Sequence, residues 1–289
     1  MKQFPVRHIR PDAPVSGTPT LRMRHLQDVL EGQPLVQDLH RHEFYFILAI
    51  ETGSGSHEID FIPYAVQDKT IFCMRPGQVH QLELKPDSTG YLLEFQPGFY
   101  EPSDKDAAQR LHKASNKSFC RLEPRRFEKL LSVLSLLFHE YTNREPGYED
   151  ALRANLDYFF IEFVRQSPDP KGKPAPASNY QQQRFEEFRE LVQKHCLQYR
   201  QVSFYTEQMS LSAYQLNQVV RTATGKPAST LIMEQVLLEA KRYLLGTTYQ
   251  IKDIADILGF EDPSYFVRFF KKQSGSAPET FRTHFTKMP

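Results

Sequence analysis

Two short helix–turn–helix patterns constrain the fold of this chain more than any other feature of its sequence. The first begins with residues 204–209, which predict a short helix. After it, Ser212 and Gln215 match a capping box, in which Ser212 is the N-cap and Gln215 the third helical residue. Gly225 lies where a helix begun there would end in a left-handed residue. Residues 204–225 therefore predict two helices joined by a tight turn.

The same arrangement recurs about 50 residues later. The apolar positions of residues 251–258 predict a short helix, and Asp262 with Pro263 supplies an N-cap and a first-turn proline for the next one, which Gly275 ends. A longer helical stripe, residues 227–246, bridges the two patterns. In such units the first helix braces the second, and the N-terminal side chains of the second can enter the major groove of DNA.

The N-terminal part of the chain follows a different period. Residues 35–97 contain short apolar and aromatic stretches separated by Gly and Pro at roughly ten-residue spacing. This spacing is typical of an antiparallel sandwich or barrel. The predicted strands are residues 44–50, 57–62, 70–74, 81–84 and 91–95.

Two amphipathic helices are predicted after the strands. Apolar residues repeat at helical spacing from Phe127 to Tyr141, Pro146 and Gly147 interrupt the pattern, and a second stripe runs from Leu152 to Phe163. These helices can cover the barrel, pair with a second subunit, or do both. The first stripe offers more apolar surface than one barrel face needs, which favours a homodimer through it.

A proline-rich stretch divides the chain. Residues 167–178 hold four prolines and no large apolar side chain, which predicts an extended, solvated linker that proteases cut first. The expected organisation is a ligand-sensing and dimerisation domain at 1–166, a linker at 167–179 and a DNA-binding domain at 180–289.

Charge and cysteine usage narrow the class of protein. Residues 1–170 carry 20 basic and 24 acidic residues, whereas residues 171–289 carry 16 basic and 11 acidic ones, so a polyanionic partner is expected for the second part alone. The three cysteines are scattered and form no C-x-x-C pair, so the sequence supports neither a disulfide framework nor a zinc knuckle. No apolar run approaches the ~18 residues that span a bilayer, and the N-terminus lacks the apolar stretch of a signal peptide. A cytoplasmic protein without a membrane partner is expected.

The C-terminal pattern closely resembles the DNA-binding domain of the AraC/XylS family over roughly residues 180–285. Leu216, Gly225 and Lys241 match the first half of that domain. The second half carries most of the resemblance, through Ile251, Ile254, Ala255, Gly259, Phe260, Ser264, Tyr265, Phe266, Arg268, Phe270, Lys271, Gly275, Pro278 and Arg282.

The N-terminal part resembles the regulatory domain of the same family, a cupin-like barrel. Residues 40–45, which begin His-Arg-His, and residues 76–80, which read Pro-Gly-Gln-Val-His, carry this shorter match. The two following helices correspond in order to the dimerisation helices of the family. The resemblance thus implies an α+β chain of two domains: a cupin-like β-barrel (a double-stranded β-helix) with two following helices, then an all-α domain in which one long helix joins two helix–turn–helix motifs.

The resemblance also places the DNA contacts. Base-reading side chains are expected near the start of each recognition helix, and basic residues beside them are expected to neutralise phosphates. Arg268 can pair with guanine, Asn217 or Gln218 with adenine, and Val267 can touch a thymine methyl. Gln218 stands where family members often carry Arg, which tilts the first half toward adenine. The expected DNA-binding residues are Tyr214, Asn217, Gln218, Arg221, Lys226, Pro263, Ser264, Val267, Arg268, Lys271 and Lys272.

Three histidines raise the question of a metal in the barrel. His40, His42 and His80 match positions where cupins bind metal, but Phe46 and Ile47 stand where the cupin pattern has a carboxylate. The sequence therefore predicts a metal-free barrel without a cofactor, with these side chains lining a ligand cavity. The expected ligand-binding residues are His40, His42, Phe44, His80 and Tyr91.

The sequence thus predicts a transcription regulator, an activator, that binds duplex DNA as a homodimer and responds to a small effector such as a sugar or an aromatic compound. RNA polymerase is a further expected partner. The chain contains no G-x-S-x-G, P-loop, G-x-G-x-x-G or H-E-x-x-H motif, so catalytic residues are not expected. Two alternatives stay open: a cupin metalloenzyme fused to a DNA-binding domain, and an architectural DNA-binding protein whose barrel only dimerises.

Overall fold

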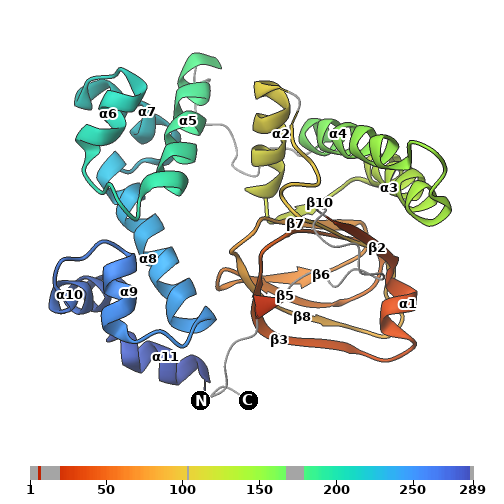
Figure 1. Ribbon diagram of the computed structural model, residues 1–289, viewed down its shortest axis with the longest axis horizontal. Helices are drawn as coiled ribbons and strands as arrows, with labels where there is room; N and C mark the ends of the chain where they lie inside the picture. The colour runs from red at the N-terminus through yellow and green to blue at the C-terminus, as the bar shows by residue number, and fades with distance from the viewer. Residues whose placement is uncertain (1–5, 8–19, 103, 167–178, 287–289) are drawn as a thin grey trace. The chain divides into compact units, whose positions relative to one another are not determined.

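The chain folds into two compact units, seen in the computed structural model of Figure 1. The structure describes residues 6–7, 20–102, 104–166 and 179–286. Described residues up to 166 form the N-terminal unit, and those from 179 onward form the C-terminal unit. The predicted linker lies outside the described residues, apart from its last position.

The described residues of the N-terminal unit form two five-stranded sheets. One sheet has the strand order β1-β3-β8-β5-β6 and the other has β10-β7-β4-β9-β2, so most strands that follow one another in the chain alternate between sheets. This is the pairing of a double-stranded β-helix, and the predicted fold class is confirmed. The strands are β1 (Val6–Arg7), β2 (Leu21–His25), β3 (Leu35–His42), β4 (Tyr45–Thr52), β5 (Gly55–Ile59), β6 (Ile62–Val66), β7 (Thr70–Met74), β8 (Val79–Leu84), β9 (Thr89–Phe95) and β10 (Phe119–Arg121).

Strand β4 is buried on both of its faces. Phe46, Leu48 and Ile50 point between the two sheets and join the core of the barrel. Ile47 and Ala49 point the other way, into a second core that the helices of the unit share. A strand with two buried faces needs an unbroken apolar run, which explains why residues 44–50 lack the alternation of a half-exposed strand.

Three helices pack on the outer face of the second sheet: α2 (Lys105–Ser115), α3 (Pro124–Asn143) and α4 (Tyr148–Gln166). The predicted stripe of α3 is buried there, with Phe127, Leu130 and Leu137 at 1% exposure or less. These side chains are therefore buried inside the unit. The apolar stripe of α3 has no exposed surplus that would support a dimer. The exposed apolar residues of this layer are instead Leu136 and Tyr158.

One predicted strand is in fact a hairpin. The sequence predicts a single strand over residues 57–62, but β5 ends at Ile59 and β6 begins at Ile62. Asp60 and Phe61 turn the chain with positive φ values of 49° and 68°, and the pair Asp-Phe lacks the glycine that usually marks such a turn. β6 lies at the edge of its sheet, where Pro63 is tolerated because it removes no ladder hydrogen bond.

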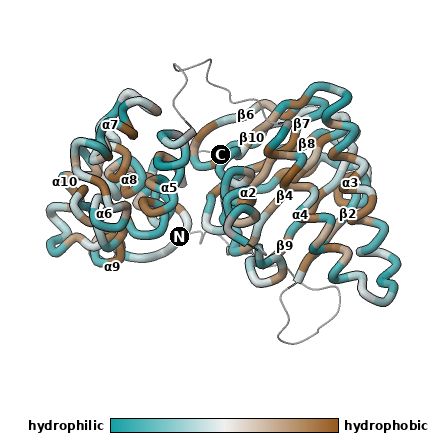
Figure 2. The backbone as a smooth tube through the Cα atoms, turned by 90° about the horizontal axis from the view of Figure 1, so that it is seen from above, coloured by the Kyte–Doolittle hydropathy of each residue, from teal (hydrophilic) through white to brown (hydrophobic). Residues whose placement is uncertain are grey.

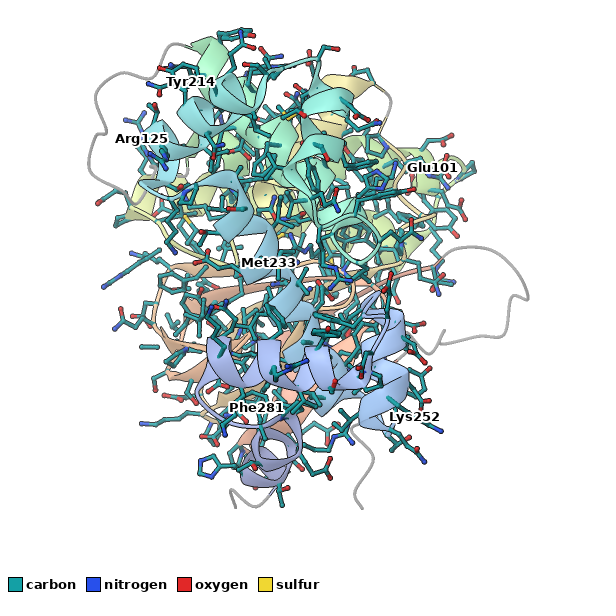
Figure 3. All side chains as sticks on the ribbon, turned by 90° about the vertical axis from the view of Figure 1, so that its left-hand side faces the viewer. Glu101, Arg125, Tyr214, Met233, Lys252 and Phe281 are labelled. Atoms are coloured by element: carbon teal, nitrogen blue, oxygen red, sulfur yellow. The ribbon has the colours of Figure 1, made fainter. Side chains whose placement is uncertain are left out.

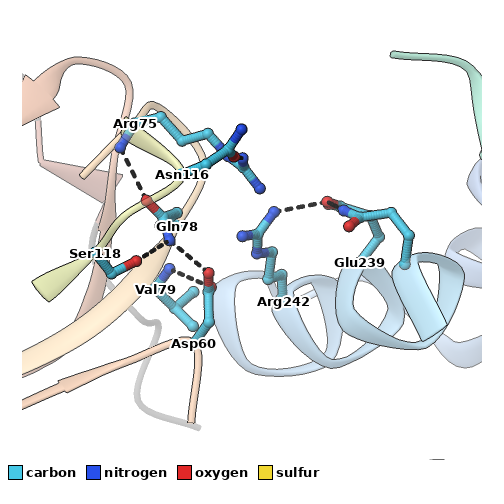
Figure 4. A network of polar contacts seen from close by, with 9 residues as sticks. Asp60, Arg75, Gln78, Val79, Asn116, Ser118, Glu239 and Arg242 are labelled. Carbon is cyan, nitrogen blue, oxygen red and sulfur yellow. Dashed lines mark hydrogen bonds and ion pairs between the residues drawn. The ribbon is translucent and has the colours of Figure 1, made fainter. Parts of the chain in front are cut away.

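A polar network ties this hairpin to the start of β8 (Figure 4). The side-chain amide of buried Gln78 donates to Asp60 at 2.7 Å and to Ser118 at 3.4 Å, and its carbonyl accepts from the backbone N–H of Arg75 at 2.9 Å. Asp60 also accepts from the backbone N–H of Val79 at 3.3 Å. The network fixes the strand on which His80 lies.

The C-terminal unit consists of helices around one apolar core, whose apolar segments appear brown in Figure 2. Two short helix pairs, α6 with α7 and α9 with α10, are joined by the longer α8, as predicted. Among the described residues, none of the helices combines the length and apolarity needed to cross a bilayer. The helices are α5 (Asn179–His195), α6 (Val202–Met209), α7 (Ala213–Thr224), α8 (Ala228–Gly246), α9 (Ile251–Ile257), α10 (Pro263–Ser274) and α11 (Pro278–Thr286); the N-terminal unit also holds the short α1 (Leu26–Leu30).

Candidate functional site

The second helix of the first pair, α7, begins with the predicted capping box. The Ser212 hydroxyl accepts from the backbone N–H of Gln215 at 3.2 Å, and the Gln215 side chain accepts from the Ser212 N–H at 2.8 Å. Gly225 ends the helix with φ 74°, as predicted. Tyr214 in the first turn is 78% exposed and is labelled in Figure 3, and Gln218 and Arg221 are exposed as well. The start of α7 is therefore available to a partner.

Asn217 differs from its exposed neighbours on α7, because its amide is used inside the unit. Its Oδ1 accepts from the backbone N–H of Ala228 at 3.0 Å, and its Nδ2 donates to the carbonyl of Ala213 at 3.0 Å. Ala228 opens α8, so Asn217 caps that helix from a neighbouring one. Pairing with adenine would require breaking these bonds, which leaves Gln218 as the amide of α7 suited to a base contact.

The second helix of the second pair, α10, has a matching start. Asp262 is its N-cap and accepts from the Ser264 N–H at 2.7 Å, and this hydrogen bond lowers the pKa of Asp262. Arg268 is exposed; its Nε donates to the Ser264 carbonyl at 3.4 Å, and its guanidinium carbon lies 4.6 Å from the ring centre of Tyr265. Stacking on Tyr265 holds the guanidinium near the first turn, the part of a recognition helix from which base contacts are expected.

The remaining predicted DNA-binding residues differ in their exposure and in whether the side chain is already paired. Lys271 and Lys272, in the last turn of α10, are exposed. Lys226 is exposed as well, but its Nζ pairs with Glu234 at 2.6 Å. Pro263 is half-buried, and Val267 is half-buried against the core of the unit. Of these, the two lysines of α10 are the best placed to meet phosphates.

Several residues of the C-terminal unit are used to hold its helices in place. A Cβ at Gly259 would lie 2.5 Å from the Leu197 carbonyl oxygen, and the residue has φ 72°. Arg200, which the sequence did not single out, lies 4.1 Å from the ring centre of Phe260 and donates to the Gly259 carbonyl. Arg282 donates to the carbonyls of Leu244, at 2.9 Å, and Tyr249, at 2.8 Å, and so holds α11 against the end of α8. Glu239 and Arg242 pair at 2.6 Å within α8 (Figure 4).

In the N-terminal unit, three of the predicted histidines meet inside the barrel. His40, His42 and His80 are at most 3% exposed, and each places a ring nitrogen within 4.8 Å of the others. The Nε2 atom of His80 lies 2.5 Å from Nε2 of His42 and 3.1 Å from Nε2 of His40. This convergence of imidazole nitrogens is the densest cluster of ligating side chains among the described residues.

A bulge in β3 turns the histidines inward. Gln37 pairs with Leu82 of β8 and His40 pairs with His80, so β3 holds one residue more than β8 between the two pairs. The extra residue inverts which side chains of β3 face the barrel, because side chains alternate along a strand. Without it Arg41 would face inward; with it His40 and His42 do.

A fourth histidine, His57 of β5, completes the cluster; its position in the sequence does not predict this, because only the pairing of β5 with β8 brings it beside His80. Its Nε2 lies 2.8 Å from Nδ1 of His80. Burial and the nearby His40 lower the pKa of His57 to about 3, so the ring is neutral. Aromatic rings surround the cluster. The ring centre of Phe44 lies 4.3 Å from that of His42, and Phe46 stacks on His42 with ring centres 5.3 Å apart.

Tyr91 does not join the histidines, because it lies on the other face of β9. It contacts His25, with ring centres 4.7 Å apart, and Phe138 of α3 at 5.8 Å. Tyr91 and His25 line a pocket of about 270 Å³ between the second sheet and α3, together with Gln27, Glu51, Gly90, Leu131, Ser132 and Ser135. The predicted ligand-binding residues therefore fall at two separate places.

A β-barrel unit with interior ligating groups, followed by a helical unit with two capped and exposed second helices, defines a two-domain transcription regulator. The AraC-like ligand-binding domain model matches residues 34–157, and a helix-turn-helix domain model matches residues 205–284. Together the two matches cover more than two thirds of the chain. The chain belongs to the AraC family of transcription regulators.

Named relatives are similar over most of their length. The transcriptional activator RhaR of Yersinia pseudotuberculosis is 22% identical over 257 residues, which cover 86% of each chain. The transcriptional regulator YfiF of Bacillus subtilis is 22% identical over 254 residues, 85% of this chain and 78% of YfiF. The structure of ToxT from Vibrio cholerae matches 92% of this chain and 98% of its own, with 13% identity and a TM-score of 0.43.

Proposed function

We propose that the chain is a sequence-specific, DNA-binding transcription activator, controlled by a small-molecule effector bound in its N-terminal unit. One observation carries the proposal: α7 and α10 each begin at a side-chain cap and present exposed side chains in their first turns. Two helices of this kind, each braced by a shorter partner, suit successive stretches of major groove. The proposed boundaries are a sensing domain at 1–166, a linker at 167–179 and a DNA-binding domain at 180–289.

The two recognition helices contribute different chemistry to the proposed interface. On α7, Tyr214 and Gln218 would contact bases, with Gln218 suited to adenine. On α10, Arg268 would pair with guanine through both of its terminal nitrogens, and Ser264 would contribute a hydroxyl. Backbone contacts would come from basic side chains beside these positions and add affinity without sequence preference: Arg221, Lys226, Lys271 and Lys272.

For the effector, we propose the pocket between the second sheet and α3. Tyr91 and His25 offer aromatic surface there, and Glu51 with Ser132 offers hydrogen-bonding groups, a combination suited to a sugar or a small aromatic compound. The pocket adjoins α3, so an occupant contacts the helical layer and the sheet at once. The remaining predicted ligand-binding residues, His40, His42, Phe44 and His80, lie in the barrel interior.

A homodimer would couple effector binding to DNA binding. Two linked DNA-binding units raise each other's local concentration when the half-site spacing suits the linker. The exposed side chains of Leu136 on α3 and Tyr158 on α4 support these helices as the dimer surface. The relative RhaR is a transcriptional activator, which supports activation as the role of this chain. An activator of this kind would contact RNA polymerase, and it would do so in the cytoplasm, where promoters are transcribed.

The test is a selection of bound sequences from random duplex DNA with the full chain. We expect an enriched site with two adjacent blocks, one for each recognition helix, repeated in a second half-site. The double variant Gln218→Ala and Arg268→Ala should still bind DNA but lose both preferences. Equal retention of all sequences by the unmodified chain would contradict sequence-specific recognition.

The effector and the dimer are tested separately on the same protein. A panel of sugars and aromatic acids is screened for a rise in melting temperature, with Tyr91→Ala as the variant that should lose the response. Sedimentation should give a dimer at micromolar concentration, and a monomer for Leu136→Asp. A monomeric unmodified chain would contradict the dimer without affecting the effector result.

A further inference from the structure

We propose that His40, His42 and His80 bind one divalent late transition-metal ion, such as zinc, through their Nε2 atoms. The proposal rests on the interior of the barrel and does not depend on the regulatory function of the chain. It also replaces the expectation of a metal-free barrel, which rested on the missing carboxylate at Phe46 and Ile47.

The spacing of the three nitrogens suits a single ion. Two nitrogens that are each about 2.1 Å from a tetrahedral ion lie roughly 3.4 Å apart. The Nε2 atoms of His80 and His40 are 3.1 Å apart, those of His80 and His42 are 2.5 Å apart, and all three rings offer nitrogens within 4.8 Å. Small outward shifts of the rings therefore place an ion at bonding distance from all three.

The protonation states required for metal binding are partly imposed by the fold. Nδ1 of His40 lies 2.6 Å from the backbone oxygen of Asp38, and because a carbonyl only accepts, the ring proton is on Nδ1. The Nε2 atom of a neutral His40 then carries a lone pair directed at His80. Asp38 lies in the bulge of β3, so the same irregularity turns His40 inward and fixes its tautomer.

A cation also resolves a conflict among the three rings. A proton on Nε2 of His80 can point at only one of its two neighbours, and without that proton the nitrogen meets the lone pair of His40 at 3.1 Å. Neutral imidazoles alone therefore cannot make both short contacts favourable. A metal ion accepts all three lone pairs at once.

His57 acts as a positioning residue for the proposed site. A metal-binding histidine usually donates its second ring N–H to a neighbour, which fixes the ring and makes the bound nitrogen more basic. Nε2 of His57, 2.8 Å from Nδ1 of His80, is the acceptor for that proton. Loss of such a partner typically weakens metal affinity tenfold to a hundredfold.

The ligand set selects the class of ion. Imidazole nitrogens favour zinc, cobalt, nickel and copper, whereas magnesium and calcium require oxygen ligands. Three protein ligands leave at least one coordination position for water or a small molecule. The apolar wall of Phe44 and Phe46 limits the size of that fourth ligand.

The experiment uses the full chain, purified without a histidine tag, stripped with a chelator and reloaded with zinc. We expect about one zinc ion per chain after gel filtration, and a higher melting temperature than that of the stripped protein. X-ray absorption of the zinc form should show a nitrogen shell with imidazole scattering. A value below one tenth of an ion per chain, or a shell of oxygen or sulfur alone, would overturn the proposal.

Matched variants locate the ion. His80→Gln and His42→Gln should retain less than one tenth of an ion, and His139→Ala, which alters an exposed histidine of α3, should retain one. His57→Ala should keep one ion but bind it tenfold to a hundredfold more weakly. Unchanged zinc content in both glutamine variants would place the ion elsewhere. Because metal content and absorption are measured on the unmodified chain, a low content or a shell without imidazole overturns the proposal even if a variant fails to fold.

Discussion

Asn217 on α7 accepts a hydrogen bond from the backbone N–H of Ala228, the first residue of α8. A side chain on a recognition helix thus caps the helix that joins the two helix–turn–helix pairs. The bond ties α7 to the start of α8, and it satisfies one of the N–H groups that have no partner within the helix at its start.

Asn217→Ala should therefore act on stability before it acts on base preference. Loss of a cap costs about 1 kcal/mol, which corresponds to a fall in melting temperature of roughly 4–8 °C for a unit of about a hundred residues. Calorimetry of the full chain measures the change. The control is Gln218→Ala, which changes the exposed neighbouring side chain. Its free energy of unfolding should stay within about 0.5 kcal/mol of that of the unmodified chain. The opposite ranking would contradict the capping role of Asn217.

Arg268 and Lys271 should separate base reading from phosphate binding. A bidentate contact between arginine and guanine is worth about 1–3 kcal/mol of discrimination, so Arg268→Ala should relax the preference at one base position. Lys271→Ala should weaken binding to specific and random DNA alike. In a plot of log binding constant against log salt concentration, the slope should become shallower by about one for each DNA-binding domain on the DNA. Binding titrations at several salt concentrations measure both. If Arg268→Ala lowers the melting temperature and leaves the base preference intact, α10 does not read DNA as assigned.

Gly259 and Gly275 form a matched pair for backbone strain. Both have left-handed φ values, 72° and 84°, but a Cβ at Gly259 would meet the Leu197 carbonyl at 2.5 Å, whereas a Cβ at Gly275 would meet nothing within 4 Å. Gly275→Ala should cost about 1–2 kcal/mol for its backbone alone. Gly259→Ala should cost about 1–3 kcal/mol more, because the neighbouring turn must move. Urea denaturation measures the free energy of unfolding of both variants. Equal losses would show that the turn at Leu197 moves aside without an energetic cost.

The buried thiols should resist alkylation in the folded chain. Burial raises the pKa of Cys73 and of Cys196 to about 12, so at pH 8 the reactive thiolate is on the order of one molecule in ten thousand, against roughly a quarter for a free cysteine. Iodoacetamide should label both residues far more slowly in buffer than in urea. Equal rates would mean that the two cores open readily.

The same shift makes stability depend on pH. In the unfolded chain these thiols ionise near pH 8.5, whereas in the folded chain they stay protonated until about pH 12. Their contribution to stability is therefore complete below pH 8.5 and declines as the pH rises through that interval. Cys73→Ala with Cys196→Ala should flatten this part of the profile, and an unchanged slope would assign it to other groups.

The helix boundaries of the C-terminal unit could be predicted because their signals are local. Ser212 and Gln215 form the expected capping box, Asp262 caps α10, and Gly225 and Gly275 end their helices. Each of these contacts joins residues at most four apart in the chain, so the sequence contains the whole determinant. The role of Asn217 depends on α8, eleven residues away, and was missed.

The barrel was harder to predict because its decisive features depend on pairing between distant strands. Which residues of β3 face inward follows from the bulge opposite Leu82, and nothing in residues 35–42 marks that bulge. The turn at Asp60 and Phe61 was hidden for a similar reason, since its positive φ values rely on neighbours such as Gln78. The aromatic side chain of Tyr91 suggests a place in the ligand cavity, but the pairing of β9 places it on the opposite face.

The two buried faces of β4 also decide how small a working sensor can be made. Removing α3 and α4 would leave Ile47, Ala49 and their neighbours Leu93 and Phe95 bare to water on a broad sheet surface. Such a surface recruits other chains into aggregates. The shortest stretch that can be produced alone, crystallised or grafted onto another DNA-binding unit must therefore run to about Gln166, well past the last strand.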